Sequence, residues 1–252
     1  MATDLSTVST LRGEVPEAFD DVADSYDLMV ALNPGYHAHL RRSANALVAS
    51  LDGARQPLRL VDVGCGSGAS TRALLAELDG LRTSAHVLGV DGSAGMLEQA
   101  ASKPWPSDVT FVQSRAEDLE GVCLNAGFGS VDGVFAAYLV RNLPDRDAFL
   151  RSVHALLRPG GTLVVHEYSV AGRPVSSAMW TAVCRGVIVP LGWLTSRQTR
   201  IYRYLWRSVL DMDSVERVMD RMVAAGFEDV RSRSVPGWQR GIVHTFHGRR
   251  PA

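Results

Sequence analysis

The chain has 252 residues, 46% of them hydrophobic and 21% charged, and its formal net charge at pH 7 is -1. These values are typical of a soluble globular enzyme and exclude a disordered tail. Because 26 Lys and Arg are balanced by 27 Asp and Glu, there is no basic excess to hold a phosphate backbone, and we expect no nucleic-acid partner. The length suits one α/β domain as well as two smaller ones, and we start from one domain with a lid.

Cysteine usage and the start of the chain both favour the cytoplasm. Cys65, Cys123 and Cys184 are odd in number and widely spaced, which suits neither a disulfide framework nor a zinc cluster and indicates a reducing compartment. The first residues are polar and acidic, without the apolar core of a signal peptide. The most apolar stretch, residues 180–194, is shorter than the ~20 residues of a membrane span. We therefore expect at most a peripheral membrane contact.

A helical pattern opens the chain, and strands and helices then alternate. The helical pattern runs from about Phe19 to Leu51, with a break near residues 33–35. Short β-branched runs predict strands at residues 58–63, 87–91, 109–113, 131–138 and 162–168. Helical patterns follow at residues 69–78, 93–101 and after Pro144, the last one ending at Gly160–Gly161. This alternation predicts a parallel sheet with helices on both faces and right-handed crossovers.

The last third of the chain changes this rhythm. Residues 170–210 are aromatic and arginine-rich, with helical pieces and no clear strand. A helix near residues 215–223 is stopped by Gly226. Residues 227–235 and 239–248 predict a terminal β-hairpin.

The strongest local signal is a glycine-rich turn, VDVGCGSGA at residues 61–69, directly after the first expected strand. Its glycines let the backbone approach a ligand closely, and the helix that follows favours polar or anionic groups at its N-terminus. Asp91 ends the second strand, where a carboxylate can accept hydrogen bonds from two ribose hydroxyls. Together these features predict a nucleoside site.

The same turn, written Gly64-x-Gly66-x-x-Ala69, also fits the dinucleotide fingerprint, so a dehydrogenase is an alternative. Three features oppose it. Asp62 stands inside the first strand, where a dehydrogenase needs an apolar residue but a cofactor with a charged amine and sulfonium gains from a carboxylate. The motif also follows a helical segment, and the sheet is expected to end in an antiparallel hairpin.

With these motifs the sequence resembles the class I S-adenosyl-L-methionine-dependent methyltransferases, and within them the ubiquinone and menaquinone C-methyltransferases. The resemblance extends from about Phe19 to the end of the chain. It is carried by VADSYD (22–27), YH (36–37), the glycine turn, VDGSAGML (90–97), RAEDL (115–119), LVRNLPD (139–145), LRPGG (157–161), HEYS (166–169) and YRYL (202–205). The family's fold is Rossmann-like α/β, with a seven-stranded, mostly parallel sheet, an antiparallel last strand and a helical lid.

The resemblance implies S-adenosyl-L-methionine as the cofactor and divides one domain into four parts. These are an N-terminal helical cover (1–55), a cofactor-binding core (56–169), a helical substrate lid (170–210) and a C-terminal helix with a β-hairpin (211–252).

The methionine end of the cofactor is implied to lie on the glycine turn. Gly64, Gly66 and Ser67 would line it, and Asp91 would bind the ribose. Ala137 stands where the family often has a serine, so only its backbone could contact the amino acid moiety.

The adenine end is implied to lie between two later loops. Gly92 and Met96 would flank the ring, and Ala116 and Glu117 would hold its edge. Tyr26 would close over the cofactor from the N-terminal cover.

For a carbon acceptor, methyl transfer needs placement, exclusion of water and deprotonation of a ring hydroxyl. The resemblance offers Arg141, acting through an ordered water beside Asn142, because a guanidinium stabilises a developing phenolate. The alternative is that Arg141 makes structural bonds at the entry to a helix. His37 and His39 in the cover are further candidate bases, and His166 is a weaker one.

The remaining chemistry-bearing residues have plainer interpretations. His154, His244 and His247 are expected to be packing or sheet residues. No cluster has metal-ligand spacing, so we expect no metal.

The aromatic residues of 175–210 either pack a helical insertion or form an apolar wall for the acceptor. Tyr138, Trp180 and Tyr202 are the candidate substrate contacts. Leu139 stands where the quinone enzymes usually have glycine, which leaves the acceptor open.

We therefore expect methyl transfer from S-adenosylmethionine to a small aromatic or prenylated acceptor, first of all C-methylation of a demethylmenaquinone-like quinol. A quinol acceptor predicts activity only with reduced substrate. N- or O-methylation of a small heteroaromatic metabolite or xenobiotic is the second interpretation, and a non-catalytic S-adenosylmethionine-binding protein is the third. A homodimer stays open.

Overall fold

The computed structural model describes residue 20 and residues 33–51, 56–196 and 199–252. Within these ranges the strands are β1 (Leu58–Val63), β2 (Ala85–Asp91), β3 (Val109–Gln113), β4 (Val131–Ala137), β5 (Leu157–Tyr168), β6 (Glu228–Ser234) and β7 (Val243–Arg249). They form one seven-stranded sheet in the order β3-β2-β1-β4-β5-β7-β6. Neighbours from β3 to β5 are parallel, and β7 is antiparallel to both β5 and β6. The expected mostly parallel sheet with an antiparallel last strand is confirmed.

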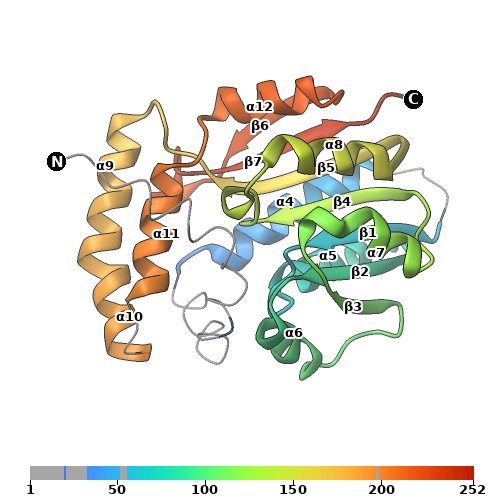
Figure 1. Ribbon diagram of the computed structural model, residues 1–252, viewed down its shortest axis with the longest axis horizontal. Helices are drawn as coiled ribbons and strands as arrows, with labels where there is room; N and C mark the ends of the chain where they lie inside the picture. The colour runs from blue at the N-terminus through green and yellow to red at the C-terminus, as the bar shows by residue number, and fades with distance from the viewer. Residues whose placement is uncertain (1–19, 21–32, 52–55, 197–198) are drawn as a thin grey trace.

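Helices cover both faces of this sheet (Figure 1). They are α4 (Tyr36–Ser50), α5 (Ala69–Gly80), α6 (Ala94–Ala101), α7 (Leu119–Asn125), α8 (Arg146–Leu156), α9 (Pro174–Val183), α10 (Val189–Ser196), α11 (Arg200–Leu210) and α12 (Val215–Ala224). Short turns of 3-10 helix are η1 (Ala116–Asp118), η2 (Val140–Asn142) and η4 (Gly237–Gln239), and η3 (Cys184–Ile188) is a π-helical turn. Residues of α7, α8 and α12 share a core on one face, and residues of α4 and α5 share a core on the other.

The alternation of side chains along β1 shows how the sequence builds these two cores. Val61 and Val63 point into the core beneath α7, α8 and α12, whereas Leu58 and Leu60 point into the core beneath α4 and α5. Successive strand residues face opposite sides of a sheet, so a buried strand must be apolar on both faces. Asp62 falls on the α5 side and is the one polar residue buried in this strand.

Two element boundaries near β5 differ from the sequence expectation. The helix α8 ends at Leu156 rather than at the glycine pair, and β5 begins at once with Leu157 instead of Thr162. Leu157 already pairs with Val131 of β4, and the register then shifts before the next pair. Gly160 has a φ of 76°, which a glycine adopts without strain because it has no Cβ atom, and this allows the irregularity in the strand. The proline and glycines are therefore part of the strand, not of a loop.

Other differences lie in short segments. The helix α7 was not expected, because its seven residues carry no clear apolar period. The strand β7 begins at Val243, not at residue 239, because Gly237–Gln239 form a 3-10 turn. His154 is half-buried, and His244 and His247 lie in β7, as the sequence predicted.

The segment expected to be a lid is helical and stands beyond the carboxyl ends of the parallel strands, at the left of Figure 1. α9, η3 and α10 follow one another without a break, and α11 lies beside them. Within the helix they form, the apolar segment Pro174–Leu194 has 21 residues, which is longer than the apolar stretch of 180–194 considered from sequence. By length and composition alone it could cross a membrane, with a mean hydropathy of 1.3 and 17% of its residues buried in the most apolar window.

A substitution at Gly133 in β4 can test how closely α4 packs on the sheet. A Cβ atom there would lie 2.9 Å from Leu47 Cδ1 and 3.1 Å from Leu51 Cδ1. We expect Gly133→Ala to lower the free energy of unfolding by about 1–3 kcal/mol through overpacking, measured by urea titration. The exposed Gly129, which has no atom within 4 Å of such a Cβ, supplies the control: Gly129→Ala should change it by less than about 0.5 kcal/mol. Equal effects of the two substitutions would contradict the close approach.

Candidate functional site

A pocket opens at the carboxyl ends of β1, β2 and β4, where the strand order reverses and ligands of open α/β sheets bind. It contains about 830 Å³ of empty space, including its open mouth. Its lining comes from the ends of β1, β2 and β4 and from the loops that follow β1, β2, β3 and β4. The lining residues are Val63, Gly64, Gly66, Val90, Asp91, Gly92, Met96, Ser114, Arg115, Ala116, Glu117, Ala137, Tyr138, Leu139, Arg141, Asn142, Leu143 and Pro144.

The glycine turn forms one wall of this pocket, and its glycines are required by both conformation and space. Gly64 and Gly66 have φ values of 72° and 52°. A Cβ atom on Gly64 would lie 3.0 Å from Leu139 Cδ1, and one on Gly66 would lie 3.1 Å from Met96 Cε. The bare backbone of the turn therefore lies directly against the pocket.

Asp91 lies at the end of β2 and is held in place by backbone donors. The N–H of Gly66 donates to its Oδ2 at 2.8 Å, and the N–H of Ser93 donates to its Oδ1 at 2.9 Å. Burial raises the pKa of Asp91, and these two N–H groups oppose that effect. Each carboxylate oxygen keeps a second lone pair, so the side chain can accept two vicinal hydroxyls from a ligand in the pocket.

Asp62 lies beneath the glycine turn and is fully buried. Its Oδ2 accepts hydrogen bonds from Ser70 Oγ at 2.7 Å and from Thr71 Oγ1 at 2.6 Å, both in α5. Its Oδ1 has no hydrogen-bond partner within the described ranges. Burial raises the pKa of Asp62 to about 6, against the hydroxyl bonds. A buried carboxylate with an unused oxygen supplies negative potential for a cation bound above it.

The other cofactor candidates divide into three groups. Gly92, Met96, Ala116, Glu117 and Ala137 line the pocket. Ser67 is buried in the turn and does not line it. Tyr26 lies outside the described residues.

Asp20 contacts the start of α6, between the pocket residues Gly92 and Met96. Its Oδ1 accepts from Ser93 Oγ at 2.5 Å and from the Gly95 N–H at 2.9 Å. Sequence reasoning missed this contact, and it also missed the pocket residues Ser114 and Arg115, which directly precede the expected Ala116.

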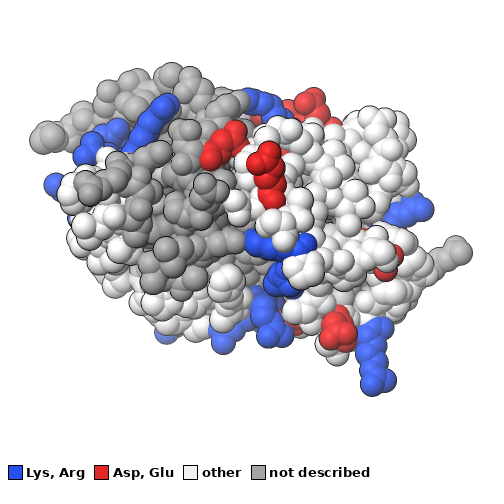
Figure 2. All heavy atoms as spheres, turned by 90° about the horizontal axis from the view of Figure 1, so that it is seen from below, with Lys and Arg blue, Asp and Glu red and all other residues white. Residues whose placement is uncertain are grey.

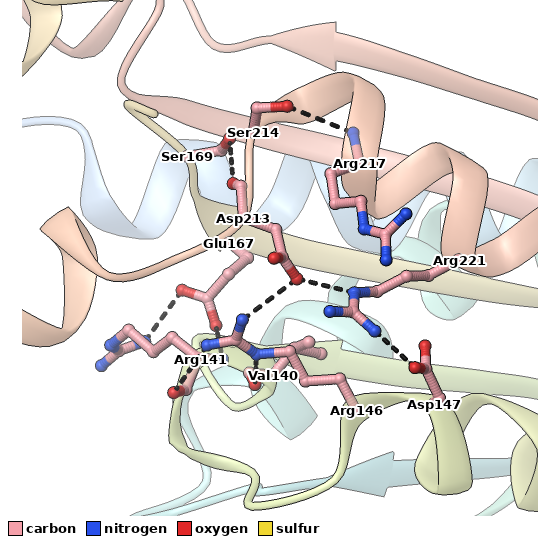
Figure 3. Close-up of polar contacts among 10 residues, drawn as sticks. All are labelled: Val140, Arg141, Arg146, Asp147, Glu167, Ser169, Asp213, Ser214, Arg217 and Arg221. Carbon is pink, nitrogen blue, oxygen red and sulfur yellow. Dashed lines mark hydrogen bonds and ion pairs between the residues drawn. The ribbon is translucent and has the colours of Figure 1, made fainter. Parts of the chain in front are cut away.

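Arg141 lies in η2 and contributes to the pocket wall, although only 5% of it is exposed. Its Nη1 donates to Glu167 Oε1 at 2.9 Å and also to the carbonyl oxygen of Tyr138. Its backbone N–H donates to Glu167 Oε2 at 3.1 Å. Figure 3 shows this pair between the η2 loop and β5. Tyr138 precedes the loop with φ 58°, a left-handed value that is strained for a tyrosine.

The ion pair fixes the protonation state of the arginine. Burial is the largest single effect and lowers the pKa of Arg141, but the Glu167 carboxylate with the Tyr168 and Tyr204 side chains together outweigh it, and the net shift is upward. The guanidinium therefore stays charged and cannot accept a proton itself. It can stabilise an anion that forms in the pocket.

A second polar network joins the η2 loop to the connection between α11 and α12 (Figure 3). Arg146 donates from Nη1 to Asp213 Oδ2 at 3.0 Å and from Nε to the Val140 carbonyl at 3.3 Å. Arg221 Nε donates to the same Asp213 oxygen at 2.8 Å, and Ser169 Oγ donates to the Asp213 carbonyl at 2.8 Å. No sequence motif indicated this network, because its members lie far apart in the chain.

Aromatic rings pack around Tyr138 below the pocket. Tyr36 stacks on it with ring centroids 5.5 Å apart, and Tyr168 and His166 lie at 5.0 Å. Tyr138 itself lines the pocket, so the candidate substrate contact is placed where a ligand can reach it.

The two other candidate substrate residues lie elsewhere. Trp180 is 1% exposed and belongs to the core, and the ring of Tyr202 packs against Gly192 in α10. Neither lines the pocket, and their role in substrate binding stays a prediction. Tyr204 instead reaches the loop, where its hydroxyl donates to Asn142 Oδ1 at 3.1 Å. The motif YRYL contained this residue, but the sequence did not show which of its tyrosines faces the loop.

The histidines proposed as bases do not line the pocket. His37 is exposed and lies edge-on to Tyr36. Burial lowers the pKa of His39, and burial lowers the pKa of His166 to about 3. His166 is therefore neutral, with Nδ1 3.0 Å from Thr245 Oγ1. Catalysis by His37 stays a prediction.

Comparison with known proteins agrees with this geometry. The model of the ubiE/COQ5 methyltransferase family matches residues 7–249. The chain is 31% identical over 242 residues to the ubiquinone/menaquinone biosynthesis C-methyltransferase UbiE of Pseudomonas paraeruginosa, covering 94% of this chain and 89% of the relative. It is 30% identical to UbiE of Hahella chejuensis, over 87% of this chain and 85% of that one.

Solved structures share the fold at low identity. The plantazolicin methyltransferase BamL, in complex with a triazolic desmethylPZN analog and SAH, matches with a TM-score of 0.66 at 12% identity, over 98% of this chain and 99% of that one. Phosphoethanolamine N-methyltransferase 2 of Haemonchus contortus, in complex with S-adenosyl-L-methionine, matches with a TM-score of 0.57 at 16% identity, over 84% of this chain and 53% of that one.

The unused oxygen of Asp62 gives a test of cofactor binding. We expect the affinity for S-adenosylmethionine to rise about tenfold from pH 5 to pH 7, because the buried carboxyl loses its proton near pH 6 and then attracts the cationic cofactor. Isothermal titration calorimetry measures this change. In Asp62→Asn the affinity should be lower at pH 7 and lack this pH-dependent rise. Asp79→Asn, at an exposed position of α5, should behave as the parent protein does. An undiminished rise in Asp62→Asn would contradict the assignment.

Proposed function

Because the chain belongs to the ubiE/COQ5 methyltransferase family and is an S-adenosylmethionine-dependent methyltransferase, we propose that it methylates a ring carbon of a reduced, demethylmenaquinone-like quinol. The observation that carries this proposal is the charged Arg141 guanidinium in the pocket wall, held by Glu167. A quinol carbon becomes nucleophilic when a ring hydroxyl loses its proton, and a fixed cation favours that phenolate.

The residues around the glycine turn fit the cofactor. S-adenosylmethionine supplies an electrophilic methyl group on a sulfonium. The bare backbone at Gly64 and Gly66 allows close approach, and Asp91 presents lone pairs to ribose hydroxyls. The Oδ1 atom of Asp62 has no hydrogen-bond partner among the described residues, and its negative charge would attract the cationic end of the cofactor. We assign the remaining contacts to Gly92, Met96, Ala116, Glu117 and Ala137, in line with their place in the pocket.

The η2 loop would handle the acceptor. Arg141 stabilises the phenolate, and Asn142, oriented by Tyr204, stands beside it to hold the water that removes the hydroxyl proton. The ring carbon then gains the methyl group and loses its own proton. We place the acceptor against Tyr138, under a lid formed by residues 170–210. We further assign the protein to the cytoplasm.

One observation favours a smaller acceptor as a second candidate. Leu139 Cδ1 lies 3.0 Å from the position of a Cβ on Gly64, so the side chain covers the turn and narrows the space in front of it. A small heteroaromatic ring methylated on nitrogen or oxygen would fit such a site and would need no reductant. The same assay separates the two acceptors.

The test is methyl transfer from labelled S-adenosylmethionine, with mass detection of the product. The acceptors are a demethylmenaquinone with a short prenyl tail, reduced and oxidised, and a panel of phenols and N-heterocycles. We expect a C-methylated product from the reduced quinol and none from the oxidised quinone. Turnover of the small aromatics alone would replace the quinol proposal by the second candidate, and cofactor binding without any turnover would contradict both.

A pair of variants separates a catalytic Arg141 from a structural one. Arg141→Met leaves the Glu167 carboxylate buried without its partner, at a cost of about 3–5 kcal/mol in the free energy of unfolding. Adding Glu167→Gln removes that charge and should recover most of the stability, measured by thermal unfolding. We expect kcat to stay about 100- to 1000-fold below the parent in both variants, because the stabilising cation is absent.

Cofactor binding by calorimetry is the control, and it should change little in the double variant. A double variant that regains both stability and turnover would show that Arg141 has a structural role only.

A further inference from the structure

The helical rod formed by α9, η3 and α10 (residues 174–196) exposes a stripe of large apolar side chains. Among the described residues, five of the eight large hydrophobic side chains that are exposed lie on it. They are Val175 (75% exposed), Met179 (44%), Val187 (56%), Trp193 (50%) and Leu194 (66%). Contiguous exposed apolar surface on a folded protein marks an interaction site.

The π-helical turn keeps Met179, Val187 and Leu194 on one face of the rod. Met179 and Val187 are eight residues apart, which in a regular α-helix is about 80° beyond two full turns. The turn η3, which contains Val187, rotates less per residue and so brings Val187 back toward the face of Met179. Leu194 then follows Val187 after seven residues, close to two turns of α-helix. The stripe therefore runs the length of the rod.

The opposite face of the rod packs on the protein. Trp180 and Cys184 are 1% and 0% exposed, and Gly192 receives the ring of Tyr202 from α11. A helix that crossed a bilayer on its own would meet lipid on every side, whereas this one has a protein-facing side and an exposed side. Its geometry is that of a helix lying in a membrane interface.

Charge indicates what covers the exposed side. From residue 174 to residue 210 the sequence has five arginines and no Asp or Glu, although the whole chain has a net charge of -1. Arg185 is exposed on the rod beside the ring of Trp206, and Arg203 is exposed on α11. We call the rod and α11 together the helical lobe. Figure 2 shows this lobe at the left, where the described surface has basic side chains (blue) and no acidic ones (red). Such a surface is complementary to anionic lipid.

We propose that the rod docks the protein on the surface of a membrane that contains anionic lipid, with Met179, Val187 and Leu194 inserted among the lipids. A second copy of the chain fits this surface less well, because a symmetric contact would bring two arginine-rich, acid-free faces together. The lobe contacts the η2 loop through Tyr204, so docking would bring the pocket close to the bilayer. That consequence rests on the proposed function, whereas the docking itself does not.

The experiment is sedimentation of the full-length protein with vesicles of phosphatidylcholine alone or mixed with phosphatidylglycerol. We expect binding to the mixed vesicles, weaker binding to neutral ones, and release at high salt. Val187→Glu and Leu194→Glu should each weaken binding about tenfold or more. Leu124→Glu on α7 and Val223→Glu on α12 change side chains that are 69% and 59% exposed, and these controls should bind as the parent does.

Several results would overturn the proposal. They are absence of vesicle binding, equal binding to neutral and anionic vesicles, and equal losses in the control variants. Bound protein that resists high salt would indicate a spanning helix instead. A stable dimer that Val187→Glu converts to monomer would make this face an interface between copies. Vesicle binding is measured without turnover, so failure of the quinol assay would leave its outcome unchanged.

Discussion

The buried ion pair between Arg141 and Glu167 is the interaction on which the site depends. Glu167 is fully buried at the end of β5 and accepts from the Arg141 guanidinium, the Arg141 backbone N–H and the Tyr168 N–H. Burying a carboxylate is costly unless it is paired, and these three donors offset that cost for Glu167. The pair therefore fixes the η2 loop to the sheet, sets the strained backbone at Tyr138, and keeps a positive charge at the wall of the pocket.

The helical lobe is connected to this loop at two points. Tyr204 of α11 donates to Asn142, and Asp213, just after α11, holds Arg146, which in turn donates to the Val140 carbonyl. A displacement of the lobe would therefore act on the residues next to Arg141. If the rod rests on a lipid surface, the same contacts would link membrane docking to the geometry of the acceptor site.

The cofactor side of the pocket is built differently, from local backbone geometry. Gly64 and Gly66 adopt positive φ values in a turn between β1 and α5, and Asp91 is positioned by the N–H groups of Gly66 and Ser93. Beneath them Asp62 holds a negative charge in the core, with hydroxyl donors on only one of its oxygens. The wall formed by the glycine turn is thus negative or neutral, which suits a cationic methyl donor. The opposite wall carries the Arg141 guanidinium, which suits an acceptor that becomes an anion.

The sequence by itself determined the strands of the sheet, the glycine turn and the place of Asp91, because these depend on side-chain period and on backbone conformations that neighbouring residues dictate. It could not place the start of β5 at Leu157, which depends on pairing with Val131 across the sheet. Nor could it find Glu167 as the partner of Arg141 or Asp213 as the partner of Arg146, since these contacts join segments 26 and 67 residues apart. Only the tertiary structure decided that Tyr204 faces the loop and Trp180 the core, because the side on which a helix packs is set by the surfaces it meets.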